Sequence, residues 1–270
     1  MKRLSAAVAV LLLVALLAAG CGRGGSAEGT IVVGATPTPH AEILAVVQEV
    51  LAEEGYTLEI KEFTDYVQPN LTLENGELDA NYFQHLPYLE DFNAENGTNL
   101  VSVAAIHYEP LGIYPGKTAA IADLADGAQI AVPNDTTNEA RALLLLESLG
   151  LITLDPDAGL QATINDITDN PKNLKILEIE AAQLARSLPD VEMAVINGNY
   201  AIQAGLNAST DALAKEEKDS LAATTFANII TVRAGDENRE DIQALIAALK
   251  SDKVKQFIDE TYQGAVITVY

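Results

Sequence analysis

A short segment rich in aromatic residues, over 82–88, contains the first side chains that could form a ligand site. Its Tyr-Phe-Gln-His-Leu-Pro-Tyr sequence combines large apolar faces with hydroxyl and imidazole groups, as small-molecule pockets commonly do. The alternative is a core strand that runs into a helix, in which Tyr82 and Phe83 would point to opposite faces. The candidate ligand-binding residues of this region are Tyr66, Tyr82, Phe83, His85 and Tyr88.

A second candidate site lies at the expected start of a helix near 136. Thr136 and Glu139 have the spacing of a capping box, and helix N-termini carry free N–H groups that suit a carboxylate. Asn138 and Arg141 are three residues apart, so they share one face of the first turns. A planar guanidinium beside a helix start predicts a clamp for an α-carboxylate. The alternative is a solvated ion pair between Arg141 and Glu139 or another surface acid.

The third candidate site follows an apolar run over 193–196. Asn197 and Asn199 come directly after this run, and their amides can accept from an ammonium group and donate to a carboxylate. The alternative is that both residues serve as turn residues or helix caps. The sequence leaves both interpretations open.

Sequence signatures of an enzyme are absent. The chain has no G-x-S-x-G elbow, no H-E-x-x-H and no phosphate loop with lysine, so we expect no catalysis and no cofactor. His40, His85 and His107 are scattered without metal-ligand spacing. A receptor that gathers a metal ion between distant histidines and an acid stays open as an alternative.

Short apolar runs alternate with amphipathic helices, which is typical of an α/β protein. The clearest helix lies over 40–54, where apolar residues recur at helical spacing. One expected strand begins at 58. The others lie over 30–35, 100–106, 129–132, 175–177, 193–196 and 227–232. The expected helices lie over 40–54, 86–96, 136–149, 181–187, 239–249 and 252–262.

An extended stretch over 107–114 interrupts this series and predicts two lobes joined by more than one crossing of the chain. We expect lobe I to contain 30–112 and 230–270, and lobe II to contain 113–229. A ligand cleft between two lobes is the usual plan of binding proteins that close by a hinge motion.

The N-terminus has the composition of a secretory signal, with two basic residues, an apolar core and small residues before a cut site. Cys21 is the only cysteine and follows Leu-Ala-Ala-Gly, which resembles the lipobox of bacterial lipoproteins. We expect a lipoprotein signal peptide over 1–20, and a lipidated Cys21 with a flexible tether over 21–29. The protein would then lie on the extracytoplasmic face of the cell membrane. An ordinary cleaved signal is the alternative.

The chain is strongly acidic, with a formal net charge of −23 at pH 7. Loss of the two basic residues of the leader would make the mature chain more negative still. This charge argues against binding to nucleic acid, and against binding to anionic lipid through the protein surface.

Several separated segments, in order along the chain, together resemble the methionine-binding lipoproteins of the MetQ/NlpA family. They are GATPTPHAEIL over 34–44, LDANYFQH over 78–85, VPND over 132–135, Asn138 with Arg141, and INGNYA over 196–201. The resemblance implies a type II periplasmic-binding-protein fold. It also implies the role of substrate-binding component of an ABC importer, with a membrane permease and its ATPase as partners.

The same resemblance implies methionine as the ligand, held between the lobes. Arg141 would hold its carboxylate with Asn138 beside it, and Asn197 or Asn199 would reach the amine or the carboxylate. Thr136 stands where the family often has proline. A methionine-containing dipeptide or another apolar amino acid stays open as an alternative ligand. The residues implied to surround the thioether are Tyr66, Phe83, His85 and Tyr88.

Overall fold

The computed structural model describes residues 29–217 and 221–270. The expected signal peptide, Cys21 and all of the tether except Gly29 lie outside these residues. The strands of the first sheet are β1 (Thr30–Ala35), β2 (Thr57–Glu62), β3 (Ala80–His85), β4 (Leu100–Tyr108), β12 (Asn228–Arg233) and β13 (Ile267–Thr268). They lie in the order β13-β4-β12-β3-β1-β2. β1 is parallel to β2 and β3, whereas β12 is antiparallel to β3 and β4.

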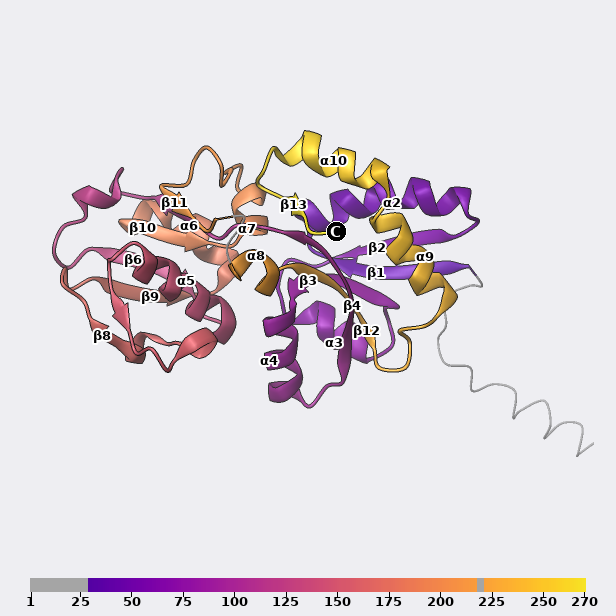
Figure 1. The fold of residues 1–270 in the computed structure, drawn as a ribbon, viewed down its shortest axis with the longest axis horizontal. Helices are drawn as coiled ribbons and strands as arrows, with labels where there is room; N and C mark the ends of the chain where they lie inside the picture. Colours follow the sequence, from indigo (N-terminus) through magenta and orange to yellow (C-terminus); the bar gives the residue numbers. More distant parts are fainter. Residues whose placement is uncertain (1–28, 218–220) are drawn as a thin grey trace, which may run out of the picture.

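Helices cover both faces of this sheet (Figure 1). They are α2 (Glu42–Glu53), α3 (Gln68–Glu74), α4 (Leu86–Asn96), α9 (Glu240–Leu249) and α10 (Asp252–Tyr262). The buried residues of α2 include Ile43, Val47 and Leu51, which recur every four residues and so form one apolar stripe. This stripe packs with α9, α10 and the sheet in the largest core of the lobe. α3 and α4 contribute Leu73 and Leu89 to a smaller core on the other face.

The second sheet has the order β11-β5-β10-β6-β9. Its strands are β5 (Gly112–Pro115), β6 (Gln129–Pro133), β9 (Lys175–Ile179), β10 (Met193–Ile196) and β11 (Ala214–Lys215), and β7 (Thr153–Leu154) pairs separately with β8 (Ile167–Asp169). The helices of this lobe are α5 (Thr136–Ser148), α6 (Leu184–Ser187) and α7 (Gly198–Gln203). α5 packs on one face of the sheet, and α6 and α7 pack on the other.

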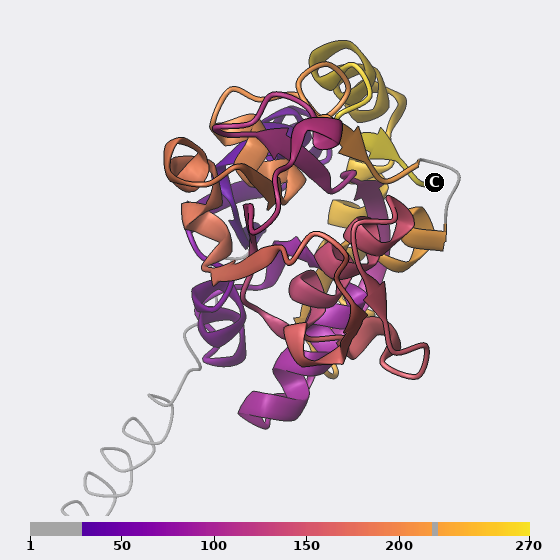
Figure 2. The same ribbon diagram turned by 90° about the vertical axis from the view of Figure 1, so that its left-hand side faces the viewer.

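The two sheets belong to two lobes that lie side by side (Figure 1), and Figure 2 looks onto the second lobe from its far end. The chain leaves the first sheet through 109–111 and returns through 216–227, which contains α8 (Leu221–Thr225). The division into lobe I (30–112 and 230–270) and lobe II (113–229) stays a prediction, and strand pairing assigns Gly112 to the second sheet and Asn228 and Ile229 to the first.

Candidate ligand-binding site

A pocket lies between the two lobes, and residues of both lobes line it. The space enclosed by its wall atoms, including the part open to solvent, is about 360 Å³. The first lobe supplies aromatic rings, and the second lobe supplies an arginine and most of the amides. The lining residues are Tyr66, Phe83, Gln84, His85, Tyr88, Glu109, Asn138, Arg141, Asn197, Gly198, Asn199 and Asn228.

Three aromatic rings of the first lobe form one wall. The ring centroid of Tyr66 lies 5.9 Å from that of Phe83 and 5.8 Å from that of Tyr88, distances at which aromatic rings pack favourably. Phe83 lies on β3, which ends at His85, and Nδ1 of His85 then caps α4 by accepting the Tyr88 N–H at 3.2 Å. The Tyr88 hydroxyl donates to the backbone oxygen of Tyr66 at 3.0 Å, which fixes the two rings relative to each other.

Tyr82 does not line the pocket, contrary to the sequence prediction. Side chains alternate along a strand, so Tyr82 and Phe83 point to opposite faces of β3. Tyr82 is fully buried in the core of the first lobe, where its hydroxyl hydrogen-bonds to Nδ1 of His107 and its ring meets the His40 ring edge-on. The predicted alternative, a strand running into a helix, is therefore correct for the backbone. Because the core covers the face of β3 that carries Tyr82, only the face that carries Phe83 can contact a ligand.

The start of α5 presents Asn138 to the pocket. Asp135 caps this helix, because its Oδ1 accepts the backbone N–H of Asn138 at 3.1 Å and the Asn138 amide at 2.8 Å. The expected capping box of Thr136 and Glu139 was wrong, since Asp135 has the extended backbone of a cap and Thr136 is already helical. Glu139 instead accepts the backbone N–H of Ile164 at 3.0 Å, and burial raises the pKa of Glu139 to about 7.

Arg141 lies buried in the pocket wall beside an acid that was not predicted, Glu216. Its Nε donates to Oε1 of Glu216 at 2.8 Å, and its Nη2 donates to Oε2 at 2.5 Å. Nη2 also donates to the backbone oxygen of Glu109, and the guanidinium lies 4.5 Å from the Phe226 ring centroid. Arg141 and Glu216 are less than a tenth exposed, so the alternative of a solvated pair with Glu139 was wrong. Burial tends to raise the pKa of Glu216, but the adjacent guanidinium outweighs this effect and lowers it.

Asn197 and Asn199 each keep one polar atom that has no partner among the residues the structure describes. The Asn197 amide nitrogen donates to Oδ1 of Asn138 at 2.8 Å, and Oδ1 of Asn199 accepts the Tyr66 hydroxyl at 2.6 Å. Asn197 Oδ1 and Asn199 Nδ2 are buried with no hydrogen-bond partner in the described part of the chain. Asn197 precedes α7 without capping it through its side chain, unlike the predicted alternative. Since unpaired buried polar groups are costly, this acceptor and this donor indicate a ligand that pairs with both.

The hinge region contributes Glu109 and Asn228 to the pocket, and neither was predicted. Gln84 and Gly198 were missed as well. A Cβ on Gly198 would lie 2.6 Å from Cβ of Glu109 and 2.7 Å from its Oε2, so only glycine fits beside this carboxylate. Burial raises the pKa of Glu109 above its ordinary value. The one available signal was Glu109, the single acid in a largely apolar stretch over 104–114.

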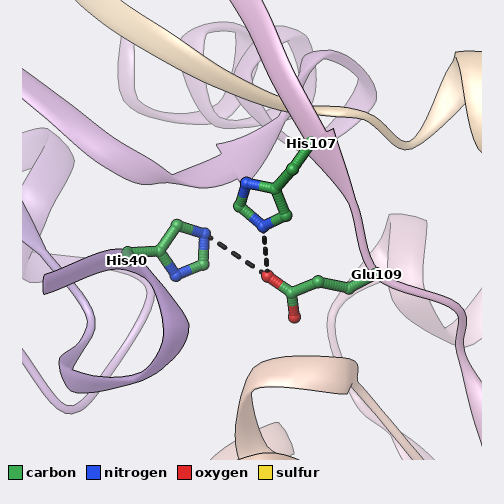
Figure 3. Close-up of side chains that lie close together, drawn as sticks. All are labelled: His40, His107 and Glu109. Atoms are coloured by element: carbon green, nitrogen blue, oxygen red, sulfur yellow. Dashed lines mark hydrogen bonds and ion pairs between the residues drawn. The ribbon is translucent and has the colours of Figure 1, made fainter. Parts of the chain in front are cut away.

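His40, His107 and Glu109 form a buried cluster next to the pocket, which we call the histidine cluster (Figure 3). Oε1 of Glu109 lies 2.7 Å from Nε2 of His107 and 3.5 Å from Nε2 of His40. Burial lowers the pKa of His40 to about 4 and that of His107 to about 3, so both rings are neutral at pH 7. The further hydrogen-bond partners of the two rings are Thr36, Asn228 and Tyr82.

Although the histidines are scattered in the sequence, the fold brings two of them, 67 positions apart, into contact beside an acid, as the metal-receptor alternative requires. Two imidazoles and a carboxylate are donors that a transition-metal ion accepts. Each ring nitrogen of His40 and His107 already has a hydrogen-bond partner, however, so a metal ion would have to replace several of these bonds.

The family model of the NlpA lipoprotein matches residues 31–270. The chain belongs to the NlpA lipoprotein family. It is 44% identical to the methionine-binding lipoprotein MetQ of Bacillus subtilis over 268 residues, which cover 97% of each chain.

Solved structures of similar proteins have the same fold. A nutrient binding protein from Burkholderia cenocepacia bound to methionine is 44% identical, with a TM-score of 0.85 over 89% of this chain and 100% of that chain. An ABC transporter periplasmic substrate-binding protein from Coxiella burnetii is 42% identical, with a TM-score of 0.84 over 88% and 100% of the two chains. Among the helices that the structure describes, none has the length and apolar character needed to cross a membrane.

For this member of the NlpA family, the predicted two-lobed α/β fold is confirmed. The structure gathers all but one of the predicted site residues around a single pocket, and Tyr82 is the exception. That these side chains bind the ligand stays a prediction. The predicted residues that line the pocket are Tyr66, Phe83, His85, Tyr88, Asn138, Arg141, Asn197 and Asn199.

Proposed function

We propose that this chain is the substrate-binding component of an ABC importer and that its ligand is methionine. The observation that carries the proposal is the pocket itself, where an aromatic wall faces an arginine and two buried amides with unpaired atoms. The names of similar proteins agree, because one is a methionine-binding lipoprotein and another is a binding protein solved with methionine.

The polar side of the pocket suits the charged end of an α-amino acid. The Nη1 edge of Arg141 and the unpaired Nδ2 of Asn199 are donors for a carboxylate. The unpaired Oδ1 of Asn197 and the carboxylate of Glu109 are acceptors for an ammonium group. The ammonium and carboxylate groups of a zwitterion would therefore form hydrogen bonds with Asn197 Oδ1 and Asn199 Nδ2, and the ammonium group would lie beside the buried Glu109.

The aromatic side suits the thioether of methionine. Sulfur packs favourably against aromatic rings, and the unbranched side chain can lie along the wall that Tyr66, Phe83 and Tyr88 form. A methionine-containing dipeptide is the alternative ligand. It fits this arrangement less well, since a peptide unit separates its ammonium group from its carboxylate.

Binding would stabilise the closed arrangement of the lobes. Direct hydrogen bonds already join them across the pocket, from Tyr66 to Asn199 at 2.6 Å and between His85 and Asn138 at 3.2 Å. A ligand that contacts both lobes adds to these bonds only in the closed state, so it shifts the population towards closure. The closed protein would then dock on a membrane permease whose ATPase drives import.

Transport by this chain would involve no covalent chemistry and no cofactor. We propose that the protein is not an enzyme and that a lipid on Cys21 holds it on the extracytoplasmic face of the membrane. The support is the lipobox-like sequence before the only cysteine and the membership of a lipoprotein family. Mass spectrometry of the membrane-extracted protein would show a diacylated N-terminal cysteine, whereas a free thiol would contradict the anchor.

Calorimetric titration tests the ligand directly. The chain from residue 30 onward is unfolded, freed of bound ligand, refolded and titrated with L-methionine, D-methionine, glycyl-methionine and leucine. We expect tight binding of methionine and weaker binding of the dipeptide and leucine. A folded protein that binds no methionine compound would contradict methionine as the ligand.

A second candidate function, a receptor for a transition-metal ion, is favoured only by the histidine cluster. Excess zinc tests it, because binding of zinc by the folded protein would raise the melting temperature.

A further inference from the structure

We propose that Glu216 is a positioning residue of the ligand site, which orients Arg141 so that the Nη1 edge of the guanidinium faces the ligand carboxylate. The inference rests on the proposed function, because it assigns a role within the same site. Arg141 is part of the pocket wall and Glu216 is not. Glu216 would therefore act on the ligand only through the arginine.

The geometry of the pair fixes one side of the guanidinium. Oε1 of Glu216 accepts from Nε at 2.8 Å, and Oε2 accepts from Nη2 at 2.5 Å. Because the guanidinium is planar and rigid, two bonds along one edge determine the direction of the third nitrogen. Nη1 is the guanidinium nitrogen for which the described residues show no hydrogen bond.

Glu216 is itself held on the hinge. Its Oε2 also accepts from the Tyr108 hydroxyl at 2.7 Å and from the Leu111 N–H at 2.9 Å. Its backbone N–H donates to the backbone oxygen of Leu111 at 3.0 Å, which continues the pairing of β11 with β5. Tyr108 precedes the first crossing between the lobes and Leu111 is its last residue, so the carboxylate cannot rotate without disturbing that crossing.

An aromatic face completes the arrangement. The guanidinium carbon lies 4.5 Å from the ring centroid of Phe226 and 5.8 Å from that of Tyr108. These rings limit tilting of the guanidinium plane, and Glu216 limits rotation within that plane. The direction of the ligand-facing edge is thus set by residues outside the pocket, and Glu216 lies 75 positions from the arginine.

A buried ion pair that serves only the fold is the competing explanation. The two explanations differ in how a substitution affects ligands with and without a carboxylate. A positioning role predicts a selective loss for ligands that carry the carboxylate. A purely structural role predicts the same loss for every ligand, or none.

The experiment compares Glu216→Gln with the parent, as full-length protein in a mild detergent, by calorimetry with L-methionine and L-methioninol. Methioninol keeps the thioether and the amine but has a hydroxymethyl group in place of the carboxylate. We expect methionine affinity to fall about 30-fold or more and methioninol affinity to stay within about twofold. In an Arg141→Ala background, the same substitution should change methionine affinity by no more than about twofold, since the two residues act as one unit.

Asp236→Asn is the matched control, because Asp236 pairs with Arg233 at 2.7 Å outside the pocket, and it should leave both affinities unchanged. If Glu216→Gln does not fold, Glu216→Asp keeps the charge on a shorter side chain and should show the same selective loss. Equal losses for the two ligands, or unchanged methionine binding, would overturn the inference. A parent protein that binds no methionine would contradict the proposed function instead.

Discussion

Two buried polar clusters lie next to each other at the centre of this molecule, and they differ in whether their atoms are paired. In the histidine cluster, each ring nitrogen of His40 and His107 has a hydrogen-bond partner. In the second group, which we call the amide cluster (Asn138, Asn197 and Asn199), two atoms are buried without a partner among the described residues.

Whether the polar atoms are paired distinguishes side chains that stabilise the fold from side chains that bind a ligand. A fully paired cluster gains nothing from a ligand, and its removal should mainly reduce stability. An incompletely paired cluster carries a desolvation cost that a ligand can remove, so its removal should mainly reduce affinity. Glu109 belongs to the first cluster and also lines the pocket, which makes it the point of contact between the two.

The largest effect is expected for Arg141→Ala, which removes the cation beside the amide cluster. Methionine affinity should fall about 100-fold or more, because the ligand loses its charged partner and Glu216 is left buried and unpaired. Calorimetry measures this loss. Arg186→Ala, at an exposed arginine of α6, should bind as the parent does. Binding of methionine by Arg141→Ala at the parent's affinity would remove Arg141 from the site.

Acid should weaken the histidine cluster. Below pH 6.5 the unfolded histidines take up protons, whereas burial delays protonation of folded His40 to about pH 4 and of folded His107 to about pH 3. The unfolded state then binds more protons, so the free energy of unfolding should fall by on the order of 5 kcal/mol between pH 6.5 and 4.5. The raised pKa of Glu109 opposes part of this loss at the acid end, because folded Glu109 binds a proton before the unfolded residue does.

Urea unfolding at several pH values measures how the free energy of unfolding changes with pH. His40→Gln should reduce the difference in bound protons between the unfolded and folded states by about one. His85 contributes in the same direction, since burial lowers its pKa to about 3 as well. Stability that does not change between pH 6.5 and 4.5 would show that these rings titrate as exposed groups do.

Gly198→Ala should disturb the contact between the two clusters. The added methyl group would overlap the Glu109 side chain and push its carboxylate from the pocket wall. We expect methionine to bind about tenfold more weakly, with a smaller change in melting temperature. Circular dichroism verifies the fold of the variant. An unchanged affinity would mean that Glu109 does not contact the ligand.

Two hydroxyl deletions provide a matched comparison of the clusters. Tyr66→Phe removes a bond to Asn199 in the pocket, and Tyr82→Phe removes a bond to His107 in the core. The first should weaken methionine binding about fivefold to tenfold. The second should lower the free energy of unfolding by about 1–2 kcal/mol and leave the affinity unchanged. The opposite pattern in calorimetry and urea unfolding would reverse the roles assigned to the two clusters.

Zinc should have the smallest effect. Because the ring nitrogens of the histidine cluster are already hydrogen-bonded, excess zinc should not shift the melting temperature. A rise that His107→Gln abolishes would instead support a metal-ion receptor.

Much of the local structure could be predicted from the sequence. The helices over 86–96 and 252–262 and the strand over 193–196 have the predicted bounds, because their apolar spacing and boundary residues are encoded by near neighbours. The short strands β5, β7, β8, β11 and β13 were not assigned. These strands have two to four residues and lack the continuous apolar run that marks β10 (Met193–Ile196), so only their partners define them.

The candidate site was predictable only where its residues lie within recognisable segments. Asn138 and Arg141 share a helix face through local geometry, and Phe83 and His85 share a strand face in the same way. Tyr82 was misplaced because the choice of the inward face depends on which core covers the strand. Asn228 had no local signal, since a lone asparagine at a strand start is common in any α/β protein.

By itself, the sequence determined the class of fold, most of the helices and longer strands, and the chemical types of the pocket residues. Only the tertiary structure decided how those residues pair. It brought Glu216 to Arg141 across 75 positions, and it placed His40 and His107 on one carboxylate. Helical and strand periodicity arise from contacts between near neighbours, whereas these pairs form only when the two crossings of the chain bring Glu109 and Glu216 to side chains of the lobes.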